Sequence, residues 1–150
     1  MKLAAPLALA ALLGTALPAS AQFAKPEDAV KYRQSALFVM SQHFGRIGAM
    51  VNGKAPYDAK AAIENAEIVE QMSHLPWAGF VAGTDKLPNT KAKPEIWTEQ
   101  AKFKELNEKL QAETPKLVAA AKTNNLDNLK SAFQATGAAC KSCHDDFRAK

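Results

Sequence analysis

The chain has 150 residues, of which 47% are hydrophobic and 23% charged, and its formal net charge is +4 at neutral pH. A charge this small, with no basic run and no aromatic residues interleaved among basic ones, gives no electrostatic basis for binding nucleic acid. The length allows one domain with one hydrophobic core.

Residues 1–21 have the pattern of a secretory signal. Lys2 supplies the positive start, an apolar stretch follows to Leu17, and Ala19-Ser20-Ala21 provides a small-residue cleavage site. The apolar stretch is shorter than the ~20 residues that a membrane-spanning helix needs. We therefore expect a signal peptide over 1–21, a mature domain over 22–150, a periplasmic location and no membrane attachment after cleavage.

Apolar residues repeat at three- and four-residue spacing in four segments, which predicts four helices. Asp58 is a good N-cap, a long connection containing glycine and proline runs from Pro76 to Pro94, and Pro115 predicts a kink or break just before it. His43 and His74 are expected near helix ends. The pattern predicts an all-α fold, an antiparallel four-helix bundle. The predicted helices cover about 26–51, 58–75, 94–121 and 127–147.

Near the end of the last predicted helix stands Cys140-Lys141-Ser142-Cys143-His144, the C-x-x-C-H pattern of c-type haem attachment. Each thiol adds across one haem vinyl group, and the adjoining histidine supplies an imidazole nitrogen to iron. On a helix, Cys140 and His144 lie one turn apart on the same face. The motif therefore predicts one covalently bound haem c.

Three other interpretations of the two cysteines fit the sequence less well. A disulfide between them would close no useful loop. A redox-active C-x-x-C normally stands at the start of a helix that follows a strand. A zinc site would need two further ligands, for which only His43 and His74 remain as histidines.

The whole mature chain resembles the cytochrome c′ family, whose members are four-helix bundles. The resemblance is carried by the attachment motif with Asp145 and Arg148 after it, and by four further stretches. These are Tyr32-Arg33-Gln34-Ser35-Ala36-Leu37, His43-Phe44-Gly45-Arg46, Leu75-Pro76-Trp77 and Lys93-Pro94-Glu95-Ile96-Trp97.

The resemblance implies thioether bonds at Cys140 and Cys143, with His144 as the only protein ligand to iron. It places Arg33 and Gln34 beside the haem, with the Arg33 guanidinium suited to a haem propionate. It also implies that Leu37 projects over the opposite face of the iron. Because an aliphatic side chain cannot bind iron, the iron is expected to be five-coordinate and high-spin. Arg148 is either a solvated cation at the helix end or a group that acts on the His144 side of the haem.

An apolar distal side favours small uncharged ligands, and we expect nitric oxide and carbon monoxide to bind. The expected function is gas binding with electron transfer, in nitric oxide tolerance. The resemblance also implies a homodimer formed through the first two helices. We expect no enzymatic activity, because no distal acid–base pair can be placed. The alternative is a simple low-spin electron carrier with Met40 as the sixth ligand, although methionine commonly fills gaps in helix interiors. The redox partners are not identified by the sequence.

Overall fold

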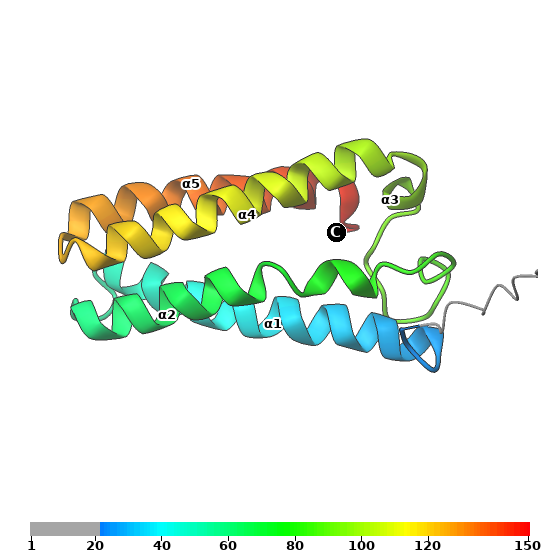
Figure 1. The fold of residues 1–150 in the computed structure, drawn as a ribbon, viewed down its shortest axis with the longest axis horizontal. Helices are drawn as coiled ribbons and strands as arrows, with labels where there is room; N and C mark the ends of the chain where they lie inside the picture. Colours follow the sequence, from blue (N-terminus) through cyan, green and yellow to red (C-terminus); the bar gives the residue numbers. More distant parts are fainter. Residues whose placement is uncertain (1–21) are drawn as a thin grey trace, which may run out of the picture.

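The computed structural model describes residues 22–150, which form an antiparallel bundle of four long helices (Figure 1). The long helices are α1 (Pro26–Val51), α2 (Ala59–Met72), α4 (Gln100–Lys122) and α5 (Leu126–Phe147). The connection between α2 and α4 contains the short 3-10 helix η1 (Pro76–Gly79) and α3 (Glu95–Thr98). The prediction of an all-α four-helix bundle is confirmed. The expected signal peptide lies outside the described residues, among which no helix is long and apolar enough to cross a membrane.

Local sequence signals determine where three of the long helices begin. Pro26 occupies the first turn of α1, where its missing N–H has no partner to lose. The carboxylate of Asp58 accepts a backbone hydrogen bond from the first turn of α2 at 3.0 Å. The side-chain oxygen of Asn125 accepts two such bonds, at 2.9 and 3.0 Å, from the first turn of α5. Side-chain caps of this kind satisfy N–H groups that the helix itself leaves unpaired.

The sequence predicts a kink or a break at Pro115, and the break is wrong, because the helix that contains Pro115 is not interrupted. α4 continues through Pro115, and the chain leaves helical geometry instead at Glu99 (φ −113°, ψ 44°), between α3 and α4. A proline at 115 removes the N–H that would bind the carbonyl of Gln111. The hydroxyl of Thr114 donates to that carbonyl at 3.5 Å, which partly replaces the lost bond.

The histidines also differ from expectation in one respect. His43 lies inside α1 rather than near its end, and its Nδ1 is 2.8 Å from the side-chain oxygen of Asn65 on α2. Asn65 is buried and donates its amide to the Ala61 carbonyl at 2.6 Å, so the pair joins α1 to α2. His74, as expected, is exposed just beyond the end of α2.

The helices pack as two pairs, α1 with α2 and α4 with α5, and α2 and α4 join the pairs (Figure 1). α1 and α5 contact each other much less. They meet where Phe44 stacks on Phe133, with ring centroids 4.2 Å apart, beside Gly48. A Cβ at Gly48 would lie 2.9 Å from the Phe133 ring, so this close approach depends on the glycine. Farther along, towards the start of α1 and the end of α5, a cavity separates the two helices.

Candidate haem-binding site

The cavity between α1 and α5 has a volume of about 700 Å³, within the usual range for ligand and cofactor sites. Most of its lining is aliphatic or aromatic. Neither aspartate nor glutamate is among the lining residues of the described chain. The lining residues from α1 and α5 include Arg33, Gln34, Leu37, Phe38, Met40, Cys140, Cys143, His144 and Phe147.

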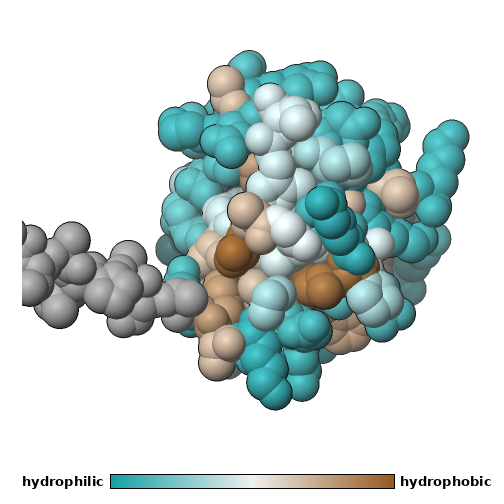
Figure 2. All heavy atoms as spheres, turned by 90° about the vertical axis from the view of Figure 1, so that its right-hand side faces the viewer, coloured by the Kyte–Doolittle hydropathy of each residue, from teal (hydrophilic) through white to brown (hydrophobic). Residues whose placement is uncertain are grey.

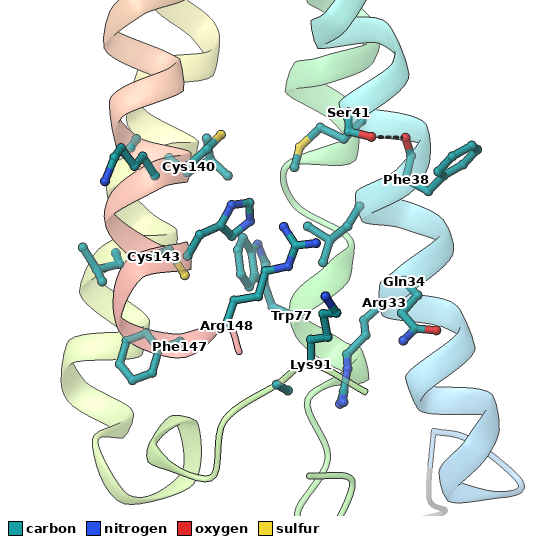
Figure 3. A pocket seen from close by; sticks show the side chains of 18 of the residues that line it. Arg33, Gln34, Phe38, Ser41, Trp77, Lys91, Cys140, Cys143, Phe147 and Arg148 are labelled. Atoms are coloured by element: carbon teal, nitrogen blue, oxygen red, sulfur yellow. Dashed lines mark hydrogen bonds between the residues drawn. The ribbon is translucent and has the colours of Figure 1, made fainter. Parts of the chain in front are cut away.

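All three motif residues line this cavity from the last turns of α5. Cys140, Cys143 and His144 fall within four residues, so the helix presents them together. Figure 3 shows Cys140 and Cys143 on α5 at one side of the cavity and α1 at the opposite side. Both thiols are free and half-buried. Two sulfur atoms and one imidazole therefore face a single space from one helix.

The surroundings favour the neutral form of these three groups. Burial raises the pKa of Cys140. Burial, assisted by Cys140 and Asp146, raises the pKa of Cys143 to about 11. Burial also lowers the pKa of His144, and the charge of Arg148 adds to this effect, while Asp145 opposes it. A neutral imidazole keeps the nitrogen lone pair that iron coordination requires.

Arg33 lines the cavity, but its guanidinium is already bound by the protein. Nη1 donates to the Gly79 carbonyl at 2.8 Å and to the Thr84 hydroxyl at 2.6 Å. Nη2 donates to the Thr84 carbonyl at 3.3 Å and to the Thr90 hydroxyl at 2.7 Å. The residue is 2% exposed, and its guanidinium carbon lies 4.7 Å from the centroid of the Phe80 ring. Arg33 thus holds the connection between α2 and α4 against α1.

Gln34 makes a similar contact with the same connection. Its side-chain amide donates to the Asn89 carbonyl at 2.6 Å. The acceptors at Thr84 and Thr90 were not anticipated from the sequence, because a threonine in a loop carries no local signal of a distant arginine. Arg33 and Gln34 both line the cavity, and the partners they bind were not predicted from the sequence.

Leu37 and Met40 both line the cavity from α1. Leu37 is half-buried and packs against the hydrophobic core cluster. Met40 is 7% exposed and belongs to that cluster, which gives it an ordinary packing role. The aliphatic side chain on which the expected five-coordinate iron depends therefore shares one cavity with the imidazole of His144.

Aromatic side chains from three parts of the chain form a continuous wall at this end of the cavity. The Trp77 and Phe80 rings lie 6.1 Å apart, Phe103 meets Phe80 edge-on at 5.0 Å, and Phe147 meets Phe103 edge-on at 5.4 Å. Trp97 is not among the residues that line the cavity. Phe103 was missed by the sequence analysis, since an aromatic residue on an amphipathic helix looks like ordinary core.

The donor set fits haem c better than the alternatives. A zinc site lacks ligands, because within residues 22–150 no group of three or more His, Cys, Asp and Glu side chains lies close enough to hold a metal ion. A reactive dithiol needs a lowered thiol pKa, whereas burial raises the pKa of both cysteines. Two thiols, one imidazole and a large apolar cavity are the features that a covalently attached porphyrin requires.

Comparisons with known proteins agree with this chemistry. The family model described as Cytochrome C' matches residues 28–148. Cytochrome c' of Alcaligenes xylosoxydans xylosoxydans is 51% identical over 129 residues, covering 86% of this chain and 99% of the relative. The crystal structure of cytochrome c' from Rubrivivax gelatinosus is 49% identical, with a TM-score of 0.81, and covers 85% of this chain and all of that one.

A third similar structure is the nitric oxide complex of a leucine-to-alanine mutant of cytochrome c prime from Alcaligenes xylosoxidans, with 50% identity and a TM-score of 0.79. The match covers 86% of this chain and 99% of the chain in that structure. The chain therefore belongs to the cytochrome c′ family and, like its members, carries one covalently bound haem c.

Proposed function

We propose that this chain is a periplasmic haem protein that binds nitric oxide and carbon monoxide at a five-coordinate, high-spin iron. Its haem is attached at Cys140 and Cys143, and His144 is the only protein ligand to iron. The observation that supports this most directly is that these three residues and Leu37 line one cavity from facing helices. The haem supplies an iron that binds a neutral diatomic and exchanges single electrons.

The residues of the chain have separate roles in this proposal. Each thiol of Cys140 and Cys143 adds across a vinyl group, so that a carbon–sulfur bond forms and the thiol proton goes to the neighbouring vinyl carbon. His144 binds through the neutral imidazole that its lowered pKa favours. Leu37 fills the opposite side and offers no hydrogen bond, which disfavours anionic ligands there.

The nitric oxide complex of a similar protein supports gas binding here. We further propose that the protein contributes to nitric oxide tolerance, passes electrons to partners not yet identified, and forms a homodimer. Binding and electron transfer, without catalysis of a reaction, are its proposed activities.

The attachment is tested by treating the purified holoprotein with acid acetone. The haem should remain on the wild-type chain, because thioether bonds survive where iron coordination does not. Cys140→Ala and Cys143→Ala should each leave only one thioether, and the double variant should release all of its haem. Free extraction of haem from the wild type would contradict the proposed attachment.

The role of Leu37 is tested by Leu37→Ala, which should speed the binding of carbon monoxide to the reduced protein. Burying a leucine side chain contributes about 1.5–3 kcal/mol, and losing half of such a barrier, about 0.75–1.5 kcal/mol, raises a rate about 4- to 13-fold. Leu106→Ala is the matched control, since Leu106 is also half-buried and lines the same cavity from α4. Equal acceleration in both variants would mean that the enlarged cavity, and not the position of Leu37, controls access.

Leu37→Met tests the alternative function. A thioether at this position should move the iron towards a six-coordinate, low-spin state. If instead Met40→Ala changes the resting spectrum and Leu37→Ala does not, Met40 is the sixth ligand and the protein is a simple electron carrier.

A further inference from the structure

The last turn of α5 carries the imidazole that faces the cavity, and the ends of helices are the parts that open most easily. His144 and Phe147 lie in this turn and line the cavity, and Cys143 directly precedes it. The last four carbonyls of a helix have no partner within the helix. At the end of α5 they belong to residues 144–147. The groups that bind these carbonyls therefore determine how firmly the imidazole is held.

Lys93, in the connection between α2 and α4, binds three of these carbonyls. Its side-chain amine donates to the Asp146 carbonyl at 2.9 Å and to the Asp145 carbonyl at 3.3 Å. Its backbone N–H donates to the Phe147 carbonyl at 3.0 Å. The remaining carbonyl, that of His144, accepts from the N–H of the residue after the helix at 3.2 Å. The charge of Lys93 is also favourable at the negative end of the helix dipole. One residue thus closes the end of the attachment helix.

The sequence favours this position for Lys93 through the proline that follows it. A residue that precedes a proline favours extended backbone, and Lys93 precedes Pro94. The neighbouring Ala92 forms an antiparallel bridge with Arg148, just beyond the end of α5. The Lys93 carbonyl accepts the Ile96 N–H at 3.2 Å, at the start of α3. Lys93 therefore joins the start of α3 to the end of α5.

Water competes with Lys93 for these carbonyls. The end of the molecule at which α5 finishes has a mainly hydrophilic surface with only small apolar patches (Figure 2). Asp145 is exposed, whereas Asp146 and Lys93 are half-buried. A hydrogen bond from a charged donor is about twice as strong as one between neutral groups. The Lys93 amine can therefore displace water from the end of α5 and keep the last turn helical.

Two other cations lie at the same helix end but bind side chains. Lys102 pairs with the carboxylate of Asp146 at 3.1 Å, and Lys141 pairs with that of Asp145. Exposed ion pairs of this kind contribute little to stability. Within residues 22–150, only Lys93 donates a side-chain hydrogen bond to a carbonyl of the last turn. Its effect on the backbone is therefore separable from the effect of positive charge alone.

We propose that Lys93 is a positioning residue for the haem, which keeps the His144 imidazole aligned with the iron by holding the last turn of α5 helical. This rests on the proposed binding of iron by His144. The imidazole is joined to the backbone through a single methylene carbon, so its direction follows that of the turn. A looser turn allows the imidazole a wider range of directions and weakens its bond to iron.

The test compares the wild-type holoprotein with Lys93→Met, Lys93→Arg and Lys102→Gln. Methionine keeps most of the length of the lysine side chain and leaves the backbone N–H in place, but it cannot donate to the carbonyls. Hydrogen exchange in the C-terminal peptide should become at least about tenfold faster in Lys93→Met, as expected for the loss of hydrogen bonds from a charged donor. The iron–imidazole stretching band in the resonance Raman spectrum of the reduced protein should broaden and move to lower frequency.

Lys93→Arg keeps a charged donor and should restore both the exchange rate and the band. Lys102→Gln is the matched control, because it removes one cation from the same helix end and Lys102 does not line the cavity. It should change the exchange rate by less than about fivefold and leave the band in place.

The proposal is overturned if Lys93→Met and Lys102→Gln exchange alike. It is also overturned if Lys93→Met exchanges faster while its band stays in place, because Lys93 would then stabilise the helix without positioning the imidazole. A wild-type protein without the iron–imidazole band would overturn His144 as the iron ligand, and this proposal with it. A failure that concerns Lys93 alone leaves the wild-type band intact.

Discussion

Gly79 lies where the 3-10 helix η1 touches α1, and Gly79→Ala tests whether this contact holds the wall of the haem cavity. A Cβ at this position would lie 2.6 Å from the Ala29 carbonyl oxygen, 2.8 Å from Arg33 Cβ and 3.1 Å from Arg33 N. Two of these three atoms belong to the backbone of α1, which cannot rotate out of the way. The substitution must therefore push η1 away from α1.

The expected loss of stability can be worked out from these contacts. Overpacking of this kind costs about 1–3 kcal/mol. The hydrogen bond from Arg33 to the Gly79 carbonyl, 2.8 Å long, should also weaken, and bonds to charged groups contribute about 1.5–3 kcal/mol. Alanine also lowers the entropy of the unfolded chain, which offsets about 0.4–1 kcal/mol of this loss of stability. We expect a net destabilisation of about 2–5 kcal/mol, a large share of the stability of a small domain.

The assay is urea unfolding of the holoprotein followed by far-ultraviolet circular dichroism. Ala78→Ser is the matched control, because Ala78 is the neighbouring exposed residue on η1. This substitution should change the free energy of unfolding by less than about 0.5 kcal/mol. If Gly79→Ala unfolds within the same margin as Ala78→Ser, the contact between η1 and α1 does not hold this wall.

Two further predictions concern the thiols and the oligomeric state. In a haem-free chain that circular dichroism shows to be helical, Cys143 should react with iodoacetamide at pH 8 about tenfold more slowly than a reference thiol. The pKa of about 11 lowers the fraction of Cys143 that is thiolate about a hundredfold relative to an ordinary thiol. A more basic thiolate is also about tenfold more nucleophilic, so the net rate falls about tenfold. Equal rates would contradict the burial of this thiol. Because the folded-state pKa is raised, the stability that Cys143 contributes is present below about pH 8.5 and should be lost as the pH rises towards 11. Sedimentation should report a dimer, and Val39→Glu should give a monomer if the exposed apolar residues of α1, Phe38 and Val39, form the interface. A wild-type monomer at tens of micromolar would exclude the dimer.

The parts of the fold that were predicted correctly are those with strong local signals. The N-cap at Asp58 and the apolar periodicity of α5 gave helix starts within one residue of those observed. The separate helix α3 was not predicted, because Glu99 carries no breaker signal, whereas Pro115 carries a strong one that the bundle overrides. Packing against α2 and α5 keeps α4 helical through the proline.

The same distinction applies to the site. The attachment motif is local, so Cys140, Cys143 and His144 could be named as candidates from spacing alone, and the structure shows that they line one cavity. The partners of Arg33 lie 46 to 57 residues away in the sequence, where no pattern links them to α1. Lys91 was likewise not identified as a cavity residue, because only the bridge between Ala92 and Arg148 brings this exposed loop lysine to the cavity.

The visible absorption spectrum of the reduced holoprotein, recorded before and after carbon monoxide is added, tests the central claim most directly. With His144 as the only protein ligand, the reduced protein should show a broad high-spin spectrum that carbon monoxide converts to a sharp low-spin one. Sharp, split low-spin bands before the addition, unchanged by carbon monoxide, would mean that a second side chain already occupies the iron and that the proposed gas-binding site is closed.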